Sequence, residues 1–183
     1  MTTGRARCLS PGGLARRAER LQKEDWEFRS FLKGCGDRKV DAAVRKLYMA
    51  ARKTVDCRKC RRCCIELRVP VTEKDVARLA AAVGMRPGAF RSRYLVADGD
   101  EPRKFLMRER PCPFLRKDGC AHYAARPDEC RAFPFLDRKD FASRTMEMIS
   151  NQRICPIVFE VYQGLKKDLW HDEEGGWDCC EEE

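Results

Sequence analysis

The chain has 183 residues, 37% of them charged, and its formal net charge is +9 at pH 7. This length fits one domain with extensions. No apolar run approaches the ~20 residues that span a bilayer, which excludes a membrane-spanning helix. The basic N-terminal residues also lack the apolar stretch of a secretory signal peptide, so we predict a cytoplasmic protein.

The excess of basic residues has two explanations. Lysine and arginine supply most of the non-specific affinity for nucleic acids. However, a four-thiolate zinc site or an oxidised four-iron cluster carries a net charge of about −2, and two such sites would cancel much of the excess. We therefore favour metal ions over nucleic acid as partners, and a protein partner stays open.

Two amphipathic helices are predicted before the central cysteines. Apolar residues recur at helical spacing over residues 14–33, and Gly34 offers the left-handed position that often ends a helix. Residues 37–53 repeat the pattern, with Asp37 as the N-cap. Residues 1–54 are thus expected to form an N-terminal helical hairpin extension.

The next segment mixes helices with short strands. Thr72 and the acidic residues after it predict a capped helix that ends at Gly84, and Pro87 suits the first turn of a short helix. Residues 69–71 and 104–108 are predicted short strands. This alternation favours a mainly α fold with a few short strands, a small α+β class.

A tight turn is predicted at Asp118-Gly119, between Phe114-Leu115 and Cys120. A hairpin at this turn would bring Cys112 and Cys120 together. Prolines at 127 and 156 each start a further helix, and the second has apolar residues on one face. The predicted domains are the extension 1–54, an irregular cysteine-rich metal-binding domain over 55–169, and an acidic tail over 170–183.

The chain contains 12 cysteines. Because cytosolic thiols are kept reduced, metal binding or thiol chemistry explains such a number better than disulfides do. Cys57-x2-Cys60-x2-Cys63-Cys64 suits a backbone that wraps around a metal, so that successive thiolates converge. Zinc and an iron-sulfur cluster both accept this spacing.

Cys64 directly follows Cys63, and adjacent side chains diverge in extended backbone, so the two do not easily share one mononuclear metal. A bridged or second centre is therefore expected. Four later cysteines could complete it, which gives eight thiols for two four-ligand sites or one polynuclear cluster: Cys112, Cys120, Cys130 and Cys155.

The order of the motifs is specific. After Cys-x2-Cys-x2-Cys-Cys come Cys-Pro-Phe-Leu at 112–115, Cys-x2-Tyr-x2-Arg-Pro-x2-Cys-Arg-x-Phe-Pro at 120–134, and Cys-Pro at 155–156. Over about residues 55–165 the chain resembles the YkgJ-like CxxCxxCC family, whose domain is described as zinc- or iron-chelating. The resemblance implies that the chelating cysteines are Cys57, Cys60, Cys63, Cys64, Cys112, Cys120, Cys130 and Cys155.

Relatives in that family include a flagellin lysine methylase, in which the cysteine domain is part of a larger protein. Methylation therefore does not transfer to this short chain. Four cysteines lie outside the motif and are expected to be ordinary thiols: Cys8, Cys35, Cys179 and Cys180.

Charged and aromatic residues around the cysteines have two readings each. The cations between the first cysteines are Arg58, Lys59, Arg61 and Arg62, and we favour compensation of thiolate charge over a solvated basic turn. The segment 126–134 reads first as structure and second as a substrate-anion site. His122 could ligate metal, although eight thiols make it superfluous, and Tyr123 could bond a ligand or fill core.

These observations predict a metal-binding protein with a cysteine-ligated zinc or iron (iron-sulfur) centre, which is structural or serves metal handling. The first alternative is an iron-sulfur enzyme or electron-transfer component that acts in protein modification. The second is a zinc-dependent nucleic-acid-binding module that presents the basic residues near Cys57–Cys64. No nucleophile–base pair or phosphate-binding loop supports catalysis directly.

Overall fold

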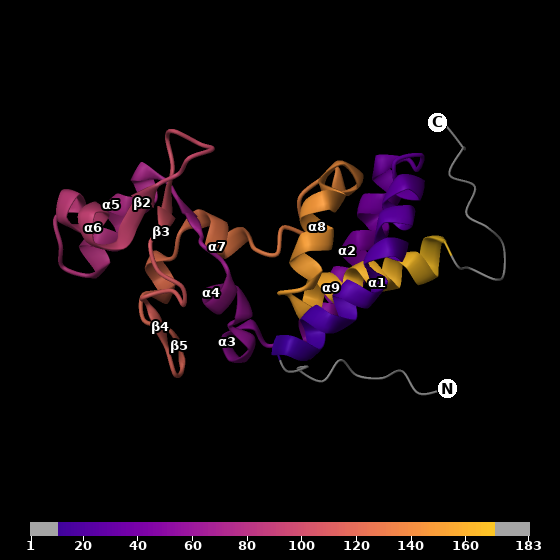
Figure 1. Ribbon diagram of the computed structural model, residues 1–183, viewed down its shortest axis with the longest axis horizontal. Coiled ribbons are helices and arrows are strands. Elements are labelled where there is room, and N and C mark those ends of the chain that lie inside the picture. The colour runs from indigo at the N-terminus through magenta and orange to yellow at the C-terminus, as the bar shows by residue number, and fades with distance from the viewer. Residues whose placement is uncertain (1–10, 171–183) are drawn as a thin grey trace. The chain divides into compact units, whose positions relative to one another are not determined.

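The computed structural model describes residues 11–170, and these divide into two compact units. We call residues 11–56 and 134–170 the helical unit, and Cys57–Phe133 the cysteine unit (Figure 1). The sequence predicts different limits, at 1–54, 55–169 and 170–183. These limits follow the cysteine motif rather than the two compact units, and they stay a prediction. The acidic tail after residue 170 lies outside the described residues.

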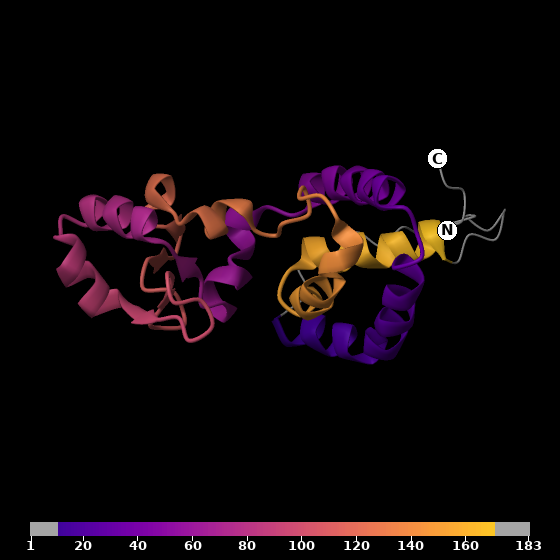
Figure 2. The ribbon, with the colours of Figure 1, turned by 90° about the horizontal axis from the view of Figure 1, so that it is seen from above.

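The helical unit is built around its last helix, α9. That helix contacts α1, α2 and α8, and it lies between α1 and α2 in Figure 2. The helices predicted over 14–33, over 37–53 and from Pro156 are confirmed, whereas α8 and the turn before it were not predicted. The elements are α1 (Pro11–Leu32), α2 (Asp37–Thr54), η2 (Phe141–Arg144), α8 (Thr145–Gln152) and α9 (Pro156–Leu169).

Two details at the α1–α2 connection differ from the prediction. Gly34 does not have a positive φ, since the glycines that do are Gly84 and Gly119. Gly36 is the N-cap of α2, and Asp37 is its first helical residue. The acidic side chain therefore lies in the first turn, where it faces the positive end of the helix dipole.

The core of the helical unit is formed by the apolar faces of these helices. The rings of Phe28 and Tyr162 meet edge to face at 5.5 Å between centroids. Gly164 allows α9 to approach α2, because a Cβ atom there would lie 3.0 Å from Leu47 Cδ2. Close packing of this kind makes the contact between the two helices sensitive to a single added methyl group.

A buried polar network crosses the same core. Lys166 is 2% exposed, and its Nζ lies 2.6 Å from Asp25 Oδ1 and 3.0 Å from Glu24 Oε1. Gln152 Nε2 donates to Asp25 Oδ2 at 2.8 Å, and the Tyr162 hydroxyl donates to the Asp25 carbonyl at 3.0 Å. The buried Asp25 carboxylate is thus both paired with a cation and hydrogen-bonded, which makes its burial tolerable.

The cysteine unit contains short elements. A three-stranded antiparallel sheet has the order β1-β3-β2, and β4 and β5 form a separate hairpin. The elements are α3 (Cys57–Cys60), α4 (Arg62–Glu66), β1 (Pro70–Val71), α5 (Glu73–Ala82), α6 (Pro87–Tyr94), β2 (Leu95–Ala97), β3 (Phe105–Met107), β4 (Leu115–Arg116), β5 (Gly119–Cys120), η1 (Tyr123–Ala125) and α7 (Asp128–Ala132).

Local signals predicted most of these elements. Thr72 caps α5 in a capping box with Asp75, Gly84 follows the helix with a φ of 70°, and Pro87 opens α6. The strands predicted over 69–71 and 104–108 are confirmed as β1 and β3. Strand β2 was not predicted, because it is three residues long and is defined by its pairing with β3.

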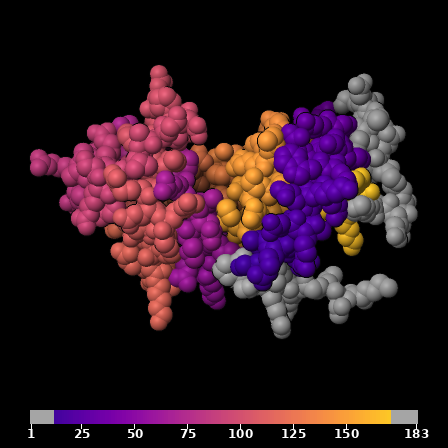
Figure 3. Space-filling view, in the orientation of Figure 1, coloured from indigo at the N-terminus to yellow at the C-terminus, as the bar shows by residue number. Residues whose placement is uncertain are grey.

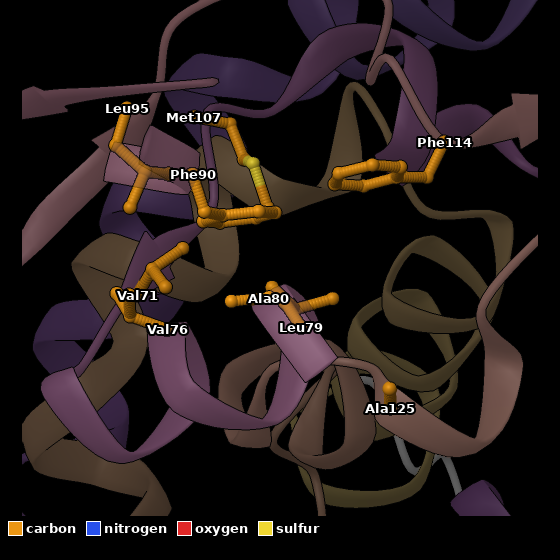
Figure 4. Packing of buried hydrophobic residues seen from close by; sticks show 9 residues of the cluster. All are labelled: Val71, Val76, Leu79, Ala80, Phe90, Leu95, Met107, Phe114 and Ala125. Atoms are coloured by element: carbon orange, nitrogen blue, oxygen red, sulfur yellow. The ribbon is translucent and has the colours of Figure 1, made fainter. Parts of the chain in front are cut away.

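A cluster of nine buried apolar residues joins α5 and α6 to the sheet (Figure 4). The rings of Phe90 and Phe114 stack within it at 6.0 Å, and Cys112 and Cys120 pack against its edge. The predicted fold class, mainly helical with a few short strands, is confirmed. Within residues 11–170 no helix is long and apolar enough to cross a membrane.

Candidate metal centre

Seven of the eight predicted ligands belong to the cysteine unit. Cys57 and Cys60 lie on α3, Cys63 and Cys64 on α4, and the other three on the segment before β4, on β5 and on α7: Cys112, Cys120 and Cys130. The eighth, Cys155, is the N-cap of α9 in the helical unit and is 7% exposed. None of the eight is in a disulfide.

Backbone contacts bring distant cysteines together. The Cys112 amide donates to the Cys64 carbonyl at 2.8 Å. The predicted hairpin is present, and its register pairs Leu115 with Cys120. Helix α3 in turn contacts β5. Segments 57–64 and 112–120 therefore meet, although about 50 residues separate them in the sequence.

The thiol of Cys64 is more acidic than an ordinary cysteine. A hydrogen bond from the Cys63 side chain is the largest cause, and Arg126 and Arg61 add to it against the opposing effect of burial, so that the pKa of Cys64 falls to about 7. Thiolates are the form that binds metal and reacts with electrophiles. Cys64 is accordingly ionised in part near neutral pH.

Two neighbouring thiols behave in the opposite way. The pKa of Cys130 is raised to about 12, chiefly by burial, with contributions from the negative charges of Cys112, Cys64 and Cys120 and an opposing effect of Arg126. Burial also raises the pKa of Cys112, and Cys64 and Cys120 contribute to that rise. These four residues are thus close enough to repel as thiolates, and we call Cys64, Cys112, Cys120 and Cys130 the four-thiol cluster.

The predicted charge compensation is supported for Arg61 and extends to Arg126, which the sequence assigned first to structure. Arg61 also has a left-handed backbone and donates from Nη1 to the Arg116 carbonyl at 2.9 Å and to the Lys117 carbonyl. It thereby holds the turn of the β4–β5 hairpin, which projects from the surface in Figure 3. Arg62 is 5% exposed, and its terminal nitrogens have no hydrogen-bond partner among residues 11–170.

The aromatic residues beside the cluster have structural contacts. Tyr123 is 46% exposed, and the guanidinium of Arg126 lies 3.6 Å from its ring centroid, with Arg58 at 5.3 Å. Tyr123 is therefore not a core residue. His122 packs edge to face against Phe114 at 5.4 Å.

The donor set fits a thiophilic ion, but the thiols do not form a coordination shell. Mutually repelling, partly buried thiolates are the arrangement that zinc or an iron cluster relieves. Even so, within residues 11–170 no group of three or more His, Cys, Asp or Glu side chains is placed to hold a metal ion. Binding at this cluster would need the thiols to draw closer together.

The model of the CxxCxxCC family, described as a "putative zinc- or iron-chelating domain", matches residues 56–156. The chain belongs to the CxxCxxCC family. Membership supports metal binding in general, with zinc or iron as the ion. All eight predicted ligands lie within the CxxCxxCC match. No curated protein and no solved structure matches the chain.

The cysteines outside the CxxCxxCC match differ in part from the prediction. Cys35 is disulfide-bonded, so its assignment as an ordinary thiol is wrong. The sequence could not predict this, because a disulfide depends on which thiols approach in space. Cys8, Cys179 and Cys180 lie outside the described residues.

Proposed function

We propose that the cysteine unit is a thiolate-ligated zinc or iron domain, in which the centre is structural or serves metal handling. The observation that carries the proposal is the four-thiol cluster, because its members come from α4, from the segment before β4, from β5 and from α7. A bound cation would favour the ionised form of these thiols and so hold the four segments together. The proposed ligands are the eight cysteines of the motif, seven of which lie in the cysteine unit.

A metal would supply folding free energy here. Structural zinc contributes about 10–16 kcal/mol of apparent binding free energy in small domains, which is comparable with the whole stability of a typical domain. The elements of this unit are short, and a five-residue helix such as α7 is not stable alone. Ligation by cysteines on these elements would fix them in place.

The iron-sulfur alternative remains a distinct proposal. Iron-sulfur clusters use the same cysteine ligands, and Arg126 and Arg61 would then influence the reduction potential through their charge. A redox or protein-modification role would follow from that chemistry. The family description, zinc or iron, supports both ions equally.

The nucleic-acid alternative is less well supported. It needs Arg61 and Arg62 to face phosphates, but Arg62 is buried and Arg61 donates to backbone carbonyls of the hairpin. The guanidinium of Arg126 already lies 3.6 Å from the centroid of the Tyr123 ring, where a stacked base would compete with it. A cytoplasmic location is part of the main proposal, because a reducing compartment keeps eight thiols available.

The test is elemental analysis with a visible absorption spectrum on protein purified without oxygen. Colourless protein with zinc near one or two equivalents is the expected result for a structural or metal-handling centre. Brown protein with iron and acid-labile sulfide would favour the redox alternative. Protein that takes up neither ion, after reduction and incubation with each, would contradict both.

A matched pair of variants assigns the metal to the motif. We expect Cys60→Ser to lose bound metal and solubility, because a missing ligand leaves the other thiolates uncompensated. Cys35→Ser makes the same chemical change outside the motif and is expected to keep its metal under reducing conditions. Full metal content in Cys60→Ser would contradict the assignment.

A further inference from the structure

Helix α7 carries Cys130 but has no cap from its own sequence. Its N-cap is Pro127, whose side chain makes no capping hydrogen bond. The first helical amide, Asp128 N, donates instead to Asp75 Oδ1 at 3.1 Å, and Asp75 lies on α5. A carboxylate 53 residues earlier in the sequence therefore caps the helix that holds a proposed ligand.

The same carboxylate caps its own helix. Asp75 Oδ2 accepts from the Thr72 amide at 3.1 Å, which with the Asp75 amide donating to the Thr72 hydroxyl forms the capping box of α5, and it also accepts from that hydroxyl at 2.7 Å. Asp75 is fully buried, with 0% exposure. A buried carboxylate bonded on both oxygens holds one orientation, so it fixes the start of α7 relative to α5.

Arg78 holds the turn that leads into α7. Its Nη2 donates to the Arg126 carbonyl at 2.8 Å and to Asp128 Oδ1 at 2.7 Å, and its Nε donates to the Ala125 carbonyl at 3.4 Å. It also forms an ion pair with Asp75. The planar guanidinium thus reaches three successive points of the chain between residues 125 and 128, which a lysine cannot do.

We propose that Asp75 and Arg78 are positioning residues for the metal centre. By fixing residues 125–128 they hold Cys130 against the rest of the four-thiol cluster and hold Arg126 beside Cys64. The hydrogen bonds of both side chains go to residues 125–128, so both act on Cys130 through α7 and the turn before it. The inference rests on the proposed function, since it concerns the geometry of the same thiols.

The test compares Asp75→Asn and Arg78→Lys with Glu73→Gln in the metal-loaded protein. Glu73 is the matched control, because it lies on the same helix but pairs with Arg91 at the surface, at 2.6 Å. Two quantities are measured: the rate of metal release to excess EDTA, and the alkylation of each cysteine by N-ethylmaleimide, mapped by peptide mass spectrometry.

Metal release is expected to accelerate about 10- to 100-fold in Asp75→Asn, the range known for groups that orient metal ligands. Alkylation of Cys130 should rise by a similar factor, while that of Cys64 and Cys112 changes little. Arg78→Lys should show the same selective rise in Cys130 alkylation and in metal release, with smaller factors. This variant provides the test if Asp75→Asn does not fold. Glu73→Gln should match the wild type.

A purely structural role predicts a different pattern. The positioning role would be overturned if Asp75→Asn and Arg78→Lys lowered the melting temperature but left the rate of metal release unchanged and all thiols as protected from alkylation as in the wild type. Failure of metal to protect Cys130 in the wild type would instead overturn the proposed function itself. The two failures are therefore distinguishable in one experiment.

Discussion

The two units of this protein are stabilised in different ways. The helical unit has helices of up to 22 residues that bury continuous apolar faces, together with a paired buried lysine and aspartate. The cysteine unit has strands of two or three residues, one nine-residue apolar cluster, and thiols that repel one another when ionised. The helical unit is thus held by apolar burial and an internal ion pair, whereas we propose that the cysteine unit also needs a bound metal.

The largest expected effect is metal removal. Chelation under reducing conditions should unfold residues 57–133, since it withdraws a contribution on the order of 10 kcal/mol. The helices α1, α2 and α9 should remain protected. Hydrogen exchange with mass spectrometry measures both regions in one sample. Equal loss of protection in both regions would contradict the proposal that only the cysteine unit needs the metal.

The converse change targets the helical unit. Lys166→Met leaves Asp25 buried without its cation and should cost about 3–5 kcal/mol in the free energy of unfolding. Metal content, measured by elemental analysis, should stay the same. Lys167→Met is the control, because Lys167 is exposed on the next position of α9 and should change the unfolding midpoint little. Metal loss in Lys166→Met would show that metal binding depends on the buried ion pair of the helical unit, and would contradict the proposed difference between the two units.

A smaller effect is expected from the cap of α5. Thr72→Ala removes the hydroxyl that accepts from the Asp75 amide at 3.2 Å and should cost about 1 kcal/mol, the usual value of an N-cap. The loss is measured by urea denaturation of the metal-loaded protein, since the unit that contains Thr72 is expected to be unfolded without metal. An unchanged unfolding midpoint would contradict the role of the cap.

The smallest effect is a pH dependence in the helical unit. Burial raises the pKa of Glu160 above its ordinary value, against the opposing hydrogen bond from Thr54. The folded state therefore binds the proton more tightly, and this contribution to stability is present below the ordinary Glu pKa and lost as the pH rises through the folded one. Glu160→Gln should gain stability over the wild type at pH 7 but not at pH 4, as measured by urea denaturation at each pH.

Local patterns predicted much of the fold because they act over a few residues. The apolar spacing before Gly34 and after Pro156, the cap at Thr72 and the turn at Asp118-Gly119 each correspond to an element of the structure. The two elements that were missed lack such a local signal. Strand β2 exists through its pairing with β3, and α8 has no capping signal in front of it.

The sequence by itself determined the family and the ligand candidates, because the spacing of the cysteines and prolines is a property of the chain alone. Only the tertiary structure decided which segments meet. It packed α9 on α1 and α2, paired Lys166 with Asp25, grouped Cys64 with Cys112, Cys120 and Cys130, and gave α7 a cap from Asp75. The spacing of apolar residues predicts that one face of a helix is buried, and a helix end without a local cap predicts that its amides need an acceptor. Which residues cover the face or cap the end depends on contacts between residues far apart in the chain.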